Sequence, residues 1–223
     1  MSTAMNKVRI SLIGIDGSGK STHLYALLQE LHNRGLCCKY INLRGEYFRF
    51  ISVPFLIVCK LVGREGKFIF DGREYHTRHP YFGSQRNSIN DAWTLLFLVD
   101  ICVLALLRGY FSTRRRIILV DRCIIDSIVD LMASLRDDTL YKGRLGKLFL
   151  RLMKPRITVL LDLEEEEALD RGQDIPGLNY LRLRRPLYKK LSADLKIPII
   201  NSDRSFDIVH QEIIASIKCS GFI

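Results

Sequence analysis

The chain has 223 residues, 48% of them hydrophobic, which is enough for one sizeable core and predicts a single domain over residues 1–223. Its formal charge of +10 favours anionic partners, but does not choose among nucleotides, phosphorylated substrates, nucleic acid and an acidic membrane surface. Six cysteines without any C-x-x-C spacing argue against a disulfide framework or a zinc site and indicate reduced core residues of a cytoplasmic protein, for which we expect no signal peptide.

Strands and helices are predicted to alternate along the chain. The apolar runs expected to form strands are residues 8–13, 38–43, 117–120, 157–161 and 198–200. Helices are expected over residues 21–33, 92–107, 164–171, 181–195 and 206–218, with one or two more within 124–153. Between residues 44 and 86 we expect one or two helices and then a loop around residues 71–85. This order predicts a three-layer α/β fold, in which a five-stranded parallel sheet is flanked by helices.

The apolar run over residues 92–107 is the strongest candidate for a membrane span. It is 16 residues long and carries Asp100 in its middle. A spanning helix needs about 20 apolar residues and rarely has a central carboxylate. We therefore expect a buried core helix and no transmembrane segment.

A complete phosphate-binding loop, G-x-x-x-x-G-K-S, follows the first predicted strand and opens the first predicted helix. Its glycines let the backbone wrap a phosphate, while Lys20 supplies a cation and the Ser21 hydroxyl is a magnesium ligand. The helix N-terminus adds the positive end of its dipole. The loop predicts a P-loop NTPase fold with ATP and Mg²⁺ as cofactors, bound by Gly14, Ile15, Asp16, Gly17, Ser18, Gly19, Lys20, Ser21 and Thr22.

Asp121 stands at the carboxyl end of the third predicted strand. Ligands of parallel α/β sheets bind at these strand ends, so an aspartate there is placed to hold Mg²⁺ beside Ser21. The alternative is that Asp121 only forms a turn, as aspartates at strand ends often do. Asp16, inside the loop, either contributes to the same site or bonds the loop amides.

With these motifs the chain resembles the thymidylate kinase family. The resemblance rests on Gly14-Ile-Asp-Gly-Ser-Gly-Lys-Ser-Thr22, on Arg44 just after the second strand, and on the Asp121-Arg122 pair. It continues through Leu160-Leu-Asp162-Leu, a helix and an arginine-rich segment, so that it covers roughly residues 7–218.

The resemblance implies transfer of the γ-phosphoryl group of Mg·ATP to dTMP, giving dTDP. It implies that Arg44 and Arg122 hold the acceptor phosphate and that Phe97 stacks on the base. The position of a third phosphate-binding arginine of the family is Ile101 here. We therefore expect Ile101→Arg to tighten the binding of dTMP.

The resemblance also implies a lid, which here is short and lies around residues 171–185. In the family that the chain resembles, members without an arginine in the phosphate-binding loop draw it from the lid, so the resemblance implies that a lid cation stabilises the transferred phosphoryl group here. Four arginines are candidates for this catalytic contact: Arg171, Arg182, Arg184 and Arg185. The alternative is that they pair with surface carboxylates such as Glu164–Glu167.

Two other hypotheses about function stay open. One is a P-loop kinase that acts on a non-nucleotide or lipid-linked phosphorylated acceptor, for which residues 47–70 and Ile101 would form an apolar pocket. The other is a nucleotide-binding regulatory switch with slow hydrolysis. No nucleic-acid-binding motif is recognised, so the expected partner is a small phosphorylated molecule, and a homodimer is left open.

Overall fold

The computed structural model describes residues 8–43, 67–70, 73–76, 88–111, 117–172 and 175–221, together with Pro54 and Ile57. Arg44, one of the residues expected to hold an acceptor phosphate, lies outside the described residues.

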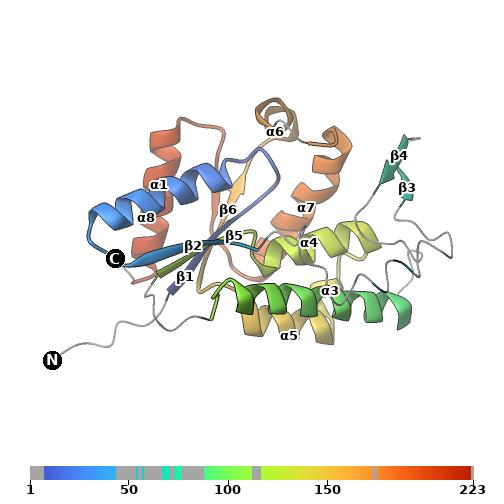
Figure 1. The fold of residues 1–223 in the computed structure, drawn as a ribbon. Helices are drawn as coiled ribbons and strands as arrows, with labels where there is room; N and C mark the ends of the chain where they lie inside the picture. Colours follow the sequence, from blue (N-terminus) through green and yellow to red (C-terminus); the bar gives the residue numbers. More distant parts are fainter. Residues whose placement is uncertain are drawn as a thin grey trace.

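A five-stranded sheet, parallel throughout, forms the middle layer, in the order β2-β5-β1-β6-β7 (Figure 1). The strands are β1 Val8–Ile13, β2 Cys38–Asn42, β5 Ile117–Asp121, β6 Ile157–Asp162 and β7 Ile199–Asn201. They lie within one or two residues of the predicted runs. The three central strands β5, β1 and β6 are almost entirely buried, and such strands are mostly apolar segments. The register pairs Asp121 with both Leu12 and Asn42, so the carboxyl ends of three strands meet at one edge of the sheet.

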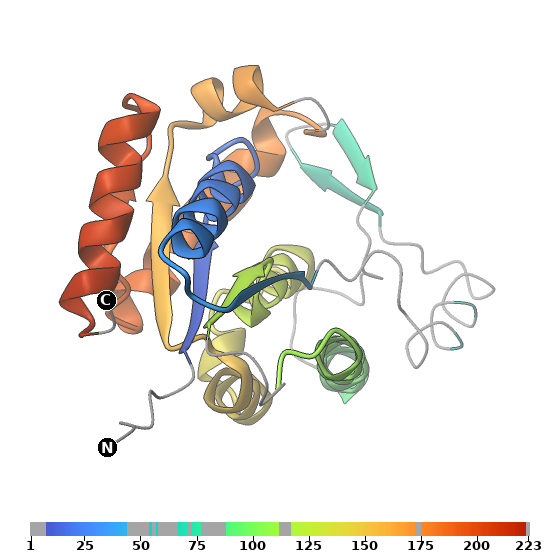
Figure 2. The same ribbon diagram turned by 60° about the vertical axis from the view of Figure 1, so that its left-hand side comes forward.

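Helices cover both faces of this sheet (Figure 1, Figure 2). On one face, leucines of the first helix and apolar residues of the last pack on the strands in one core cluster. On the other face, a second cluster contains residues of the four helices labelled α3, α4, α5 and α7. The helices are α1 Lys20–Asn33, α3 Ser88–Leu107, α4 Ile124–Leu135, α5 Arg144–Met153, α6 Glu165–Arg171, α7 Leu178–Asp194 and α8 Phe206–Cys219, with a single 3-10 turn at Leu140–Lys142. The predicted three-layer α/β fold with a five-stranded parallel sheet is confirmed.

A separate hairpin corrects the loop expected around residues 71–85. Strand β3, Lys67–Phe70, pairs antiparallel with β4, Arg73–His76. The two residues between the strands in the sequence are Asp71 and Gly72. An Asp-Gly pair between two short strand-forming runs is among the strongest hairpin signals, and the sequence reading passed over it.

Helix α3 is longer than predicted and begins at Ser88. Its 18-residue window Asn90–Leu107 has a mean hydropathy of 1.8, so in length and composition it is the one helix of the described ranges that could cross a membrane. Half of that window is buried inside the fold. Trp93, Ile101 and Leu104 belong to the core, and the Asp100 carboxylate is buried as well. This burial is what a core helix of an α/β domain shows.

Candidate functional site

The phosphate-binding loop joins β1 to α1, and its glycines are required by their surroundings. Gly14 has φ +144°, and a Cβ atom there would lie 2.4 Å from the carbonyl oxygen of Leu161. Gly17 has φ +88°, and its Cβ would lie 2.2 Å from the carbonyl oxygen of Ala168. Because both the backbone angles and the close contacts exclude a side chain, the loop is fixed against β6 and α6.

Lys20 is the first residue of α1, and its ammonium group turns back into the loop. Its Nζ donates hydrogen bonds to the carbonyl oxygens of Gly14, at 2.8 Å, and Ile15, at 2.6 Å. The carboxylate of Asp16 lies 3.8 Å away. Burial, with the positive charge of Arg122 close by, lowers the pKa of Lys20 to about 8. The loop therefore holds a desolvated cation at the place where a phosphate group would lie.

Ser21 and Asp121 meet across the strand ends. The Ser21 hydroxyl donates a hydrogen bond of 2.8 Å to Oδ2 of Asp121. The same oxygen accepts hydrogen bonds from the Tyr40 hydroxyl, at 2.6 Å, and from the side-chain amide of Asn42, at 3.2 Å. The structure thus brings together the two residues that the sequence assigned to a metal.

The other carboxylate oxygen of Asp121 supports that assignment. The side chain is 2% exposed, and within the described ranges no group donates a hydrogen bond to its buried Oδ1. A buried polar atom without a partner is costly, and a bound water molecule or ion is one way in which such an atom is satisfied. A carboxylate and a hydroxyl are hard oxygen donors of the kind that Mg²⁺ prefers, so the residues fit that ion.

Arg122 follows Asp121 and is turned toward the phosphate-binding loop. Its backbone is in the left-handed region, with φ +60°, which is uncommon for a residue other than glycine. Its guanidinium forms an ion pair with Oδ1 of Asp16, and this pairing raises its pKa further above the ordinary value for arginine. The Tyr180 hydroxyl of α7 lies 3.4 Å from the other oxygen of Asp16. Asp16 therefore ties Arg122 and the start of α7 to the loop.

A cavity of about 480 Å³ opens beside the loop. One wall consists of loop residues with Arg122, and the other contains Arg171, Arg204 and Phe206. Phe206 is 43% exposed and stacks on the ring of His23, with the ring centroids 4.6 Å apart. The cavity is thus lined both by cations that can meet phosphate groups and by an aromatic ring that can stack on a planar group. Its lining residues are Asp16, Gly17, Ser18, Gly19, Lys20, Ser21, Thr22, His23, Arg122, Arg171, Gly172, Ser202, Arg204 and Phe206.

The expected lid arginines are placed differently from one another. Arg171 ends α6 and lines the cavity, held by Glu167 at 2.9 Å and by the carbonyl oxygen of Ser202 at 3.1 Å. Arg182, which is exposed, pairs with Glu166 at 2.8 Å. Arg182 does not line the cavity beside the loop.

Two more of these arginines have carboxylate partners in the described structure. Arg184 stacks over the ring of Tyr180, with its Cζ 3.6 Å from the centroid, and bonds Asp130 of α4 at 2.9 Å. Arg185 makes a two-pronged contact with Asp162, with bonds of 2.7 and 3.1 Å, and further bonds to Glu164 and Glu165. In this arrangement Arg184 and Arg185 join helices to one another, and only Arg171 of the four lines the cavity.

The predicted base-stacking position is inside the core. Phe97 is 7% exposed and belongs to the cluster beneath α3, with its ring centroid 6.3 Å from that of Trp93. Ile101 is 2% exposed in the same cluster. The substitution Ile101→Arg would place a cation in an apolar core, which costs folding free energy. The structure therefore argues against the expectation that this substitution tightens the binding of dTMP.

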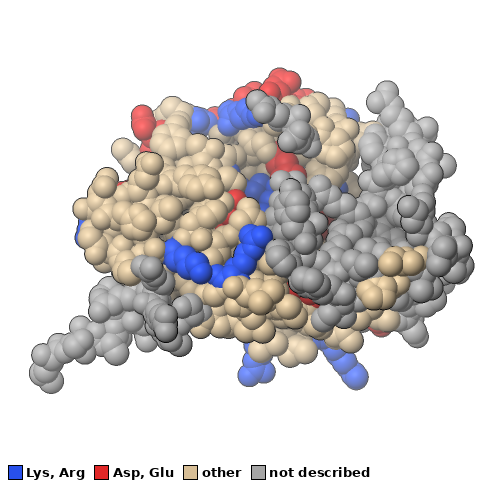
Figure 3. Space-filling view, viewed as in Figure 1, with Lys and Arg blue, Asp and Glu red and all other residues tan. Residues whose placement is uncertain are grey.

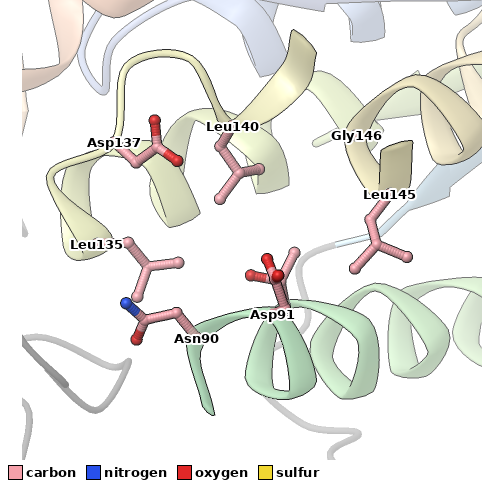
Figure 4. A pocket seen from close by; sticks show the side chains of 8 residues that line it. Asn90, Asp91, Leu135, Asp137, Leu140, Leu145 and Gly146 are labelled. Carbon is pink, nitrogen blue, oxygen red and sulfur yellow. The ribbon is translucent and has the colours of Figure 1, made fainter. Parts of the chain in front are cut away.

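A second cavity lies between the beginnings of α3 and α5 and the end of α4 (Figure 4). Figure 4 shows Asn90 and Asp91 from α3 facing Leu135 and Asp137, with Leu145 and Gly146 of α5 beside them. Its volume of about 20 Å³ has room for a single water molecule. It is too small for a nucleotide or its acceptor.

Several residues of the site belong to no sequence motif and were not predicted from the sequence. Tyr40 and Asn42 belong to β2, and their convergence on Asp121 depends on the parallel register of β2 with β5. Tyr180 stands between Asn179 and the basic run of α7, and a single tyrosine at that place carries no motif. His23 and Phe206 come from α1 and α8, which are distant in sequence and stack only in the folded chain.

Comparison with known proteins adds no family to this description: no protein-family model and no curated protein matched the chain. The resemblance to thymidylate kinases rests on the motifs of the sequence itself.

Proposed function

We propose that the protein is an ATP- and Mg²⁺-dependent phosphotransferase of the nucleoside monophosphate kinase type, with dTMP as the first candidate acceptor. The observation that supports it most is the contact of Ser21 with Asp121 at the end of a complete phosphate-binding loop. A glycine-rich turn without function would not need a buried lysine in the loop and a buried carboxylate oxygen without a partner beside it.

The residues divide the work of phosphoryl transfer, which is mostly positioning and charge stabilisation. The loop amides and Lys20 hold the phosphate groups of ATP, and Arg171 meets them from the other wall of the cavity. Ser21 and Asp121 hold Mg²⁺, which when bound neutralises charge on the phosphate oxygens. Arg122, at the same edge, orients the acceptor phosphate through a two-pronged contact.

The identity of the acceptor depends on Arg122 and on the residues that surround it. Arg122 and the resemblance favour a nucleoside monophosphate, but Ile101 lies in the core, so position 101 supplies no phosphate contact. The absence of an arginine at position 101 favours, as a second candidate, a kinase that acts on a non-nucleotide or lipid-linked phosphate, but the buried Ile101 does not line an apolar pocket for that acceptor. Both candidates share the loop, the cavity and Arg122.

One screen separates these candidates. Purified protein with Mg·ATP is offered nucleoside monophosphates, sugar phosphates and lipid-linked phosphates, and the release of ADP is measured. Stimulation by dTMP supports the first candidate, and stimulation only by another phosphorylated molecule supports the second. Slow ADP release that no acceptor changes would mean a nucleotide-binding switch. Lys20→Ala, tested in parallel, shows how much of the release is a contaminating activity.

A further inference from the structure

Helices α3 and α5 lie side by side on the outside of the fold. The Sγ atom of Cys102 in α3 is 3.0 Å from the Sδ atom of Met153 at the end of α5. At their other ends, Asn90 and Leu145 line the small cavity of Figure 4 together. The two helices are therefore neighbours over the whole length of α5, and in the view of Figure 1 they form the lower edge of the molecule.

The outer side of this helix pair is apolar over a long distance. In α3, Leu95, Leu106 and Leu107 are 42%, 61% and 65% exposed. In α5, Leu148 and Leu152 are 49% and 54% exposed. Successive residues of an α-helix are rotated by about 100° about its axis. With this rotation, Leu148 and Leu152 lie between the side of α5 that faces α3 and the side that faces solvent. They extend the apolar surface of α3 onto α5.

A row of cations borders these leucines. Residues 144–156 contain five Lys or Arg and no Asp or Glu. Three of them, Arg144, Lys147 and Arg151, recur at helical spacing on the exposed side of α5. Figure 3 shows basic side chains projecting from the lower edge of the molecule, where Figure 1 places α5. Lys154 and Arg156 continue the row past the end of the helix.

The cations of this row differ from the basic residues of α7. Those of α7 have carboxylate partners: Arg182 with Glu166, Arg184 with Asp130, Arg185 with Asp162, Lys189 with Asp162 and Lys190 with Asp138. Within the described ranges, none of the five cations of residues 144–156 forms an ion pair. Among the described residues, no carboxylate compensates their positive charge.

The row ends at a basic cavity of about 150 Å³ at the opposite end of β6 from Asp162. Lys154, Arg156 and Lys196 line it together with the hydroxyl-bearing residues Thr158, Ser216 and Ser220. Burial lowers the pKa of Lys154. Within the described part of the chain no carboxylate lines this cavity. It accommodates a group the size of a phosphate.

We propose that the outer face of α3 and α5 docks on a membrane surface that carries anionic lipid headgroups. The exposed leucines enter the boundary between headgroups and acyl chains, and the cations of residues 144–156 meet the lipid phosphates. Apolar and positive surface occur here on one face, and an anionic lipid surface is complementary to both. The protein lies on the membrane by this face and does not cross it, since the inner half of α3 is core.

Two other occupants fit the face less well. A second copy related by a two-fold axis would bring the same row of cations against itself, with like charges facing across the interface. A nucleic acid would neutralise the cations but leave the leucines in contact with water or phosphate. A second copy would cover the exposed leucines but not balance the cations, and a nucleic acid would balance the cations but not cover the leucines.

The test is flotation of the purified full-length protein with vesicles of phosphatidylcholine alone and of phosphatidylcholine mixed with phosphatidylglycerol, without nucleotide. We expect binding to the mixed vesicles that falls as salt is raised. Lys147→Gln with Arg151→Gln should lower the partition coefficient about 30-fold, from about 1 kcal/mol per cation near an anionic surface. Leu148→Ser with Leu152→Ser should lower it at least about tenfold.

Matched variants serve as controls for charge and apolarity. Arg34→Gln with Lys218→Gln removes two exposed cations from other surfaces, and Ile199→Ser with Ile208→Ser removes two side chains that are each 48% exposed. Both should bind vesicles as the unchanged protein does, and thermal unfolding checks that every variant is folded. Equal binding to both kinds of vesicle, or no binding to either, overturns the proposal. A different outcome would assign the face to a second copy of the chain. In that case the unchanged protein does not bind vesicles, and light scattering shows a dimer that Leu148→Ser with Leu152→Ser dissociates. Because no nucleotide is present, the outcome is independent of the kinase proposal.

Discussion

The hydroxyl of Ser21 and the carboxylate of Asp121 are 100 positions apart in the chain and 2.8 Å apart in the structure. The parallel pairing of β1 with β5 creates this contact, because it brings the start of α1 and the end of β5 to the same edge of the sheet. One oxygen of Asp121 accepts three hydrogen bonds and the other accepts none from the described residues. The carboxylate is thus oriented by its neighbours, with one oxygen left for a ligand.

Asp121→Asn should reduce turnover more than nucleotide binding. An amide is a poorer ligand than a carboxylate for a hard cation, so we expect the magnesium concentration for half-maximal activity to rise about 10- to 100-fold. A magnesium titration of turnover, with nucleotide affinity measured alongside, tests this. Tyr40→Phe removes one hydrogen bond to the same carboxylate without changing a ligand and should have a much smaller effect. Normal activity of Asp121→Asn across the titration would make Asp121 a turn residue.

Lys20→Ala should lower phosphoryl transfer at least about 100-fold while the protein stays folded. The ammonium stabilises charge that develops on the transferred group, and removal of one such contact costs about this factor in comparable sites. Steady-state ADP release in the presence of a stimulating acceptor is the measurement. Lys218→Ala, on the exposed side of α8, is the control for loss of a lysine. Activity within a few-fold of the unchanged protein would remove Lys20 from the mechanism.

Nucleotide affinity should fall as the pH rises above about 8. Lys20 in the folded protein has its pKa lowered to about 8, so its charge is lost above that pH, while a bound phosphate favours the charged form. Binding should therefore take up a proton at pH 8–9, which calorimetry in buffers of different ionisation enthalpy detects. The unfolded chain keeps its lysine proton up to about pH 10.5, so this group makes unfolding less favourable as the pH rises from about 8 to 10.5. A flat affinity profile from pH 7.5 to 9.5 would contradict the expectation.

Arg171→Gln should lower turnover more than stability, and Arg185→Gln should lower stability more than turnover. Arg171 lines the cavity, so its loss should lower turnover about tenfold or more and change stability little. Arg185 holds Asp162, Glu164 and Glu165, so its loss should lower the free energy of unfolding by about 1–3 kcal/mol and leave turnover within a few-fold. Turnover and chemical denaturation of both variants decide between them. A catalytic loss confined to Arg185→Gln would reverse this assignment.

Ile101→Arg should destabilise the fold by about 3–5 kcal/mol, because it places an unpaired charge among the core residues under α3. Ile101→Met is close in volume and should cost less than about 1.5 kcal/mol. Thermal unfolding of both variants checks this. An arginine variant as stable as the methionine variant, with tighter binding of dTMP, would show that position 101 reaches the acceptor after all.

The sequence predicted the sheet and the phosphate-binding loop well because both depend on local patterns. The strands of the sheet are short, mostly apolar runs, and the loop motif is itself nine residues of contiguous chain, Gly14 to Thr22. The meeting of Ser21 with Asp121 was also predictable, since the ends of parallel strands share one edge. These inferences needed the element order but no knowledge of side-chain packing.

What could not be predicted depends on contacts between distant elements. The partners of Arg184 and Arg185 come from α4, β6 and α6, and a basic run in the sequence does not reveal which acidic side chains fold against it. The burial of Ile101 was within reach, because Trp93, Phe97, Ile101 and Leu104 recur at helical spacing in α3. This spacing places position 101 on the buried side of α3, away from a role in binding the acceptor.

In its ion pair with Asp16, the positive charge of Arg122 is already balanced by a carboxylate of the protein before any ligand binds. An anion that binds the guanidinium of Arg122 would replace the carboxylate of Asp16 as its negatively charged partner. A weakly charged competitor such as chloride gains little by such an exchange, whereas a doubly charged phosphate gains a second unit of attraction. An anion bound at Arg122 would thus have to compete with the carboxylate of Asp16, which favours doubly charged over singly charged anions there.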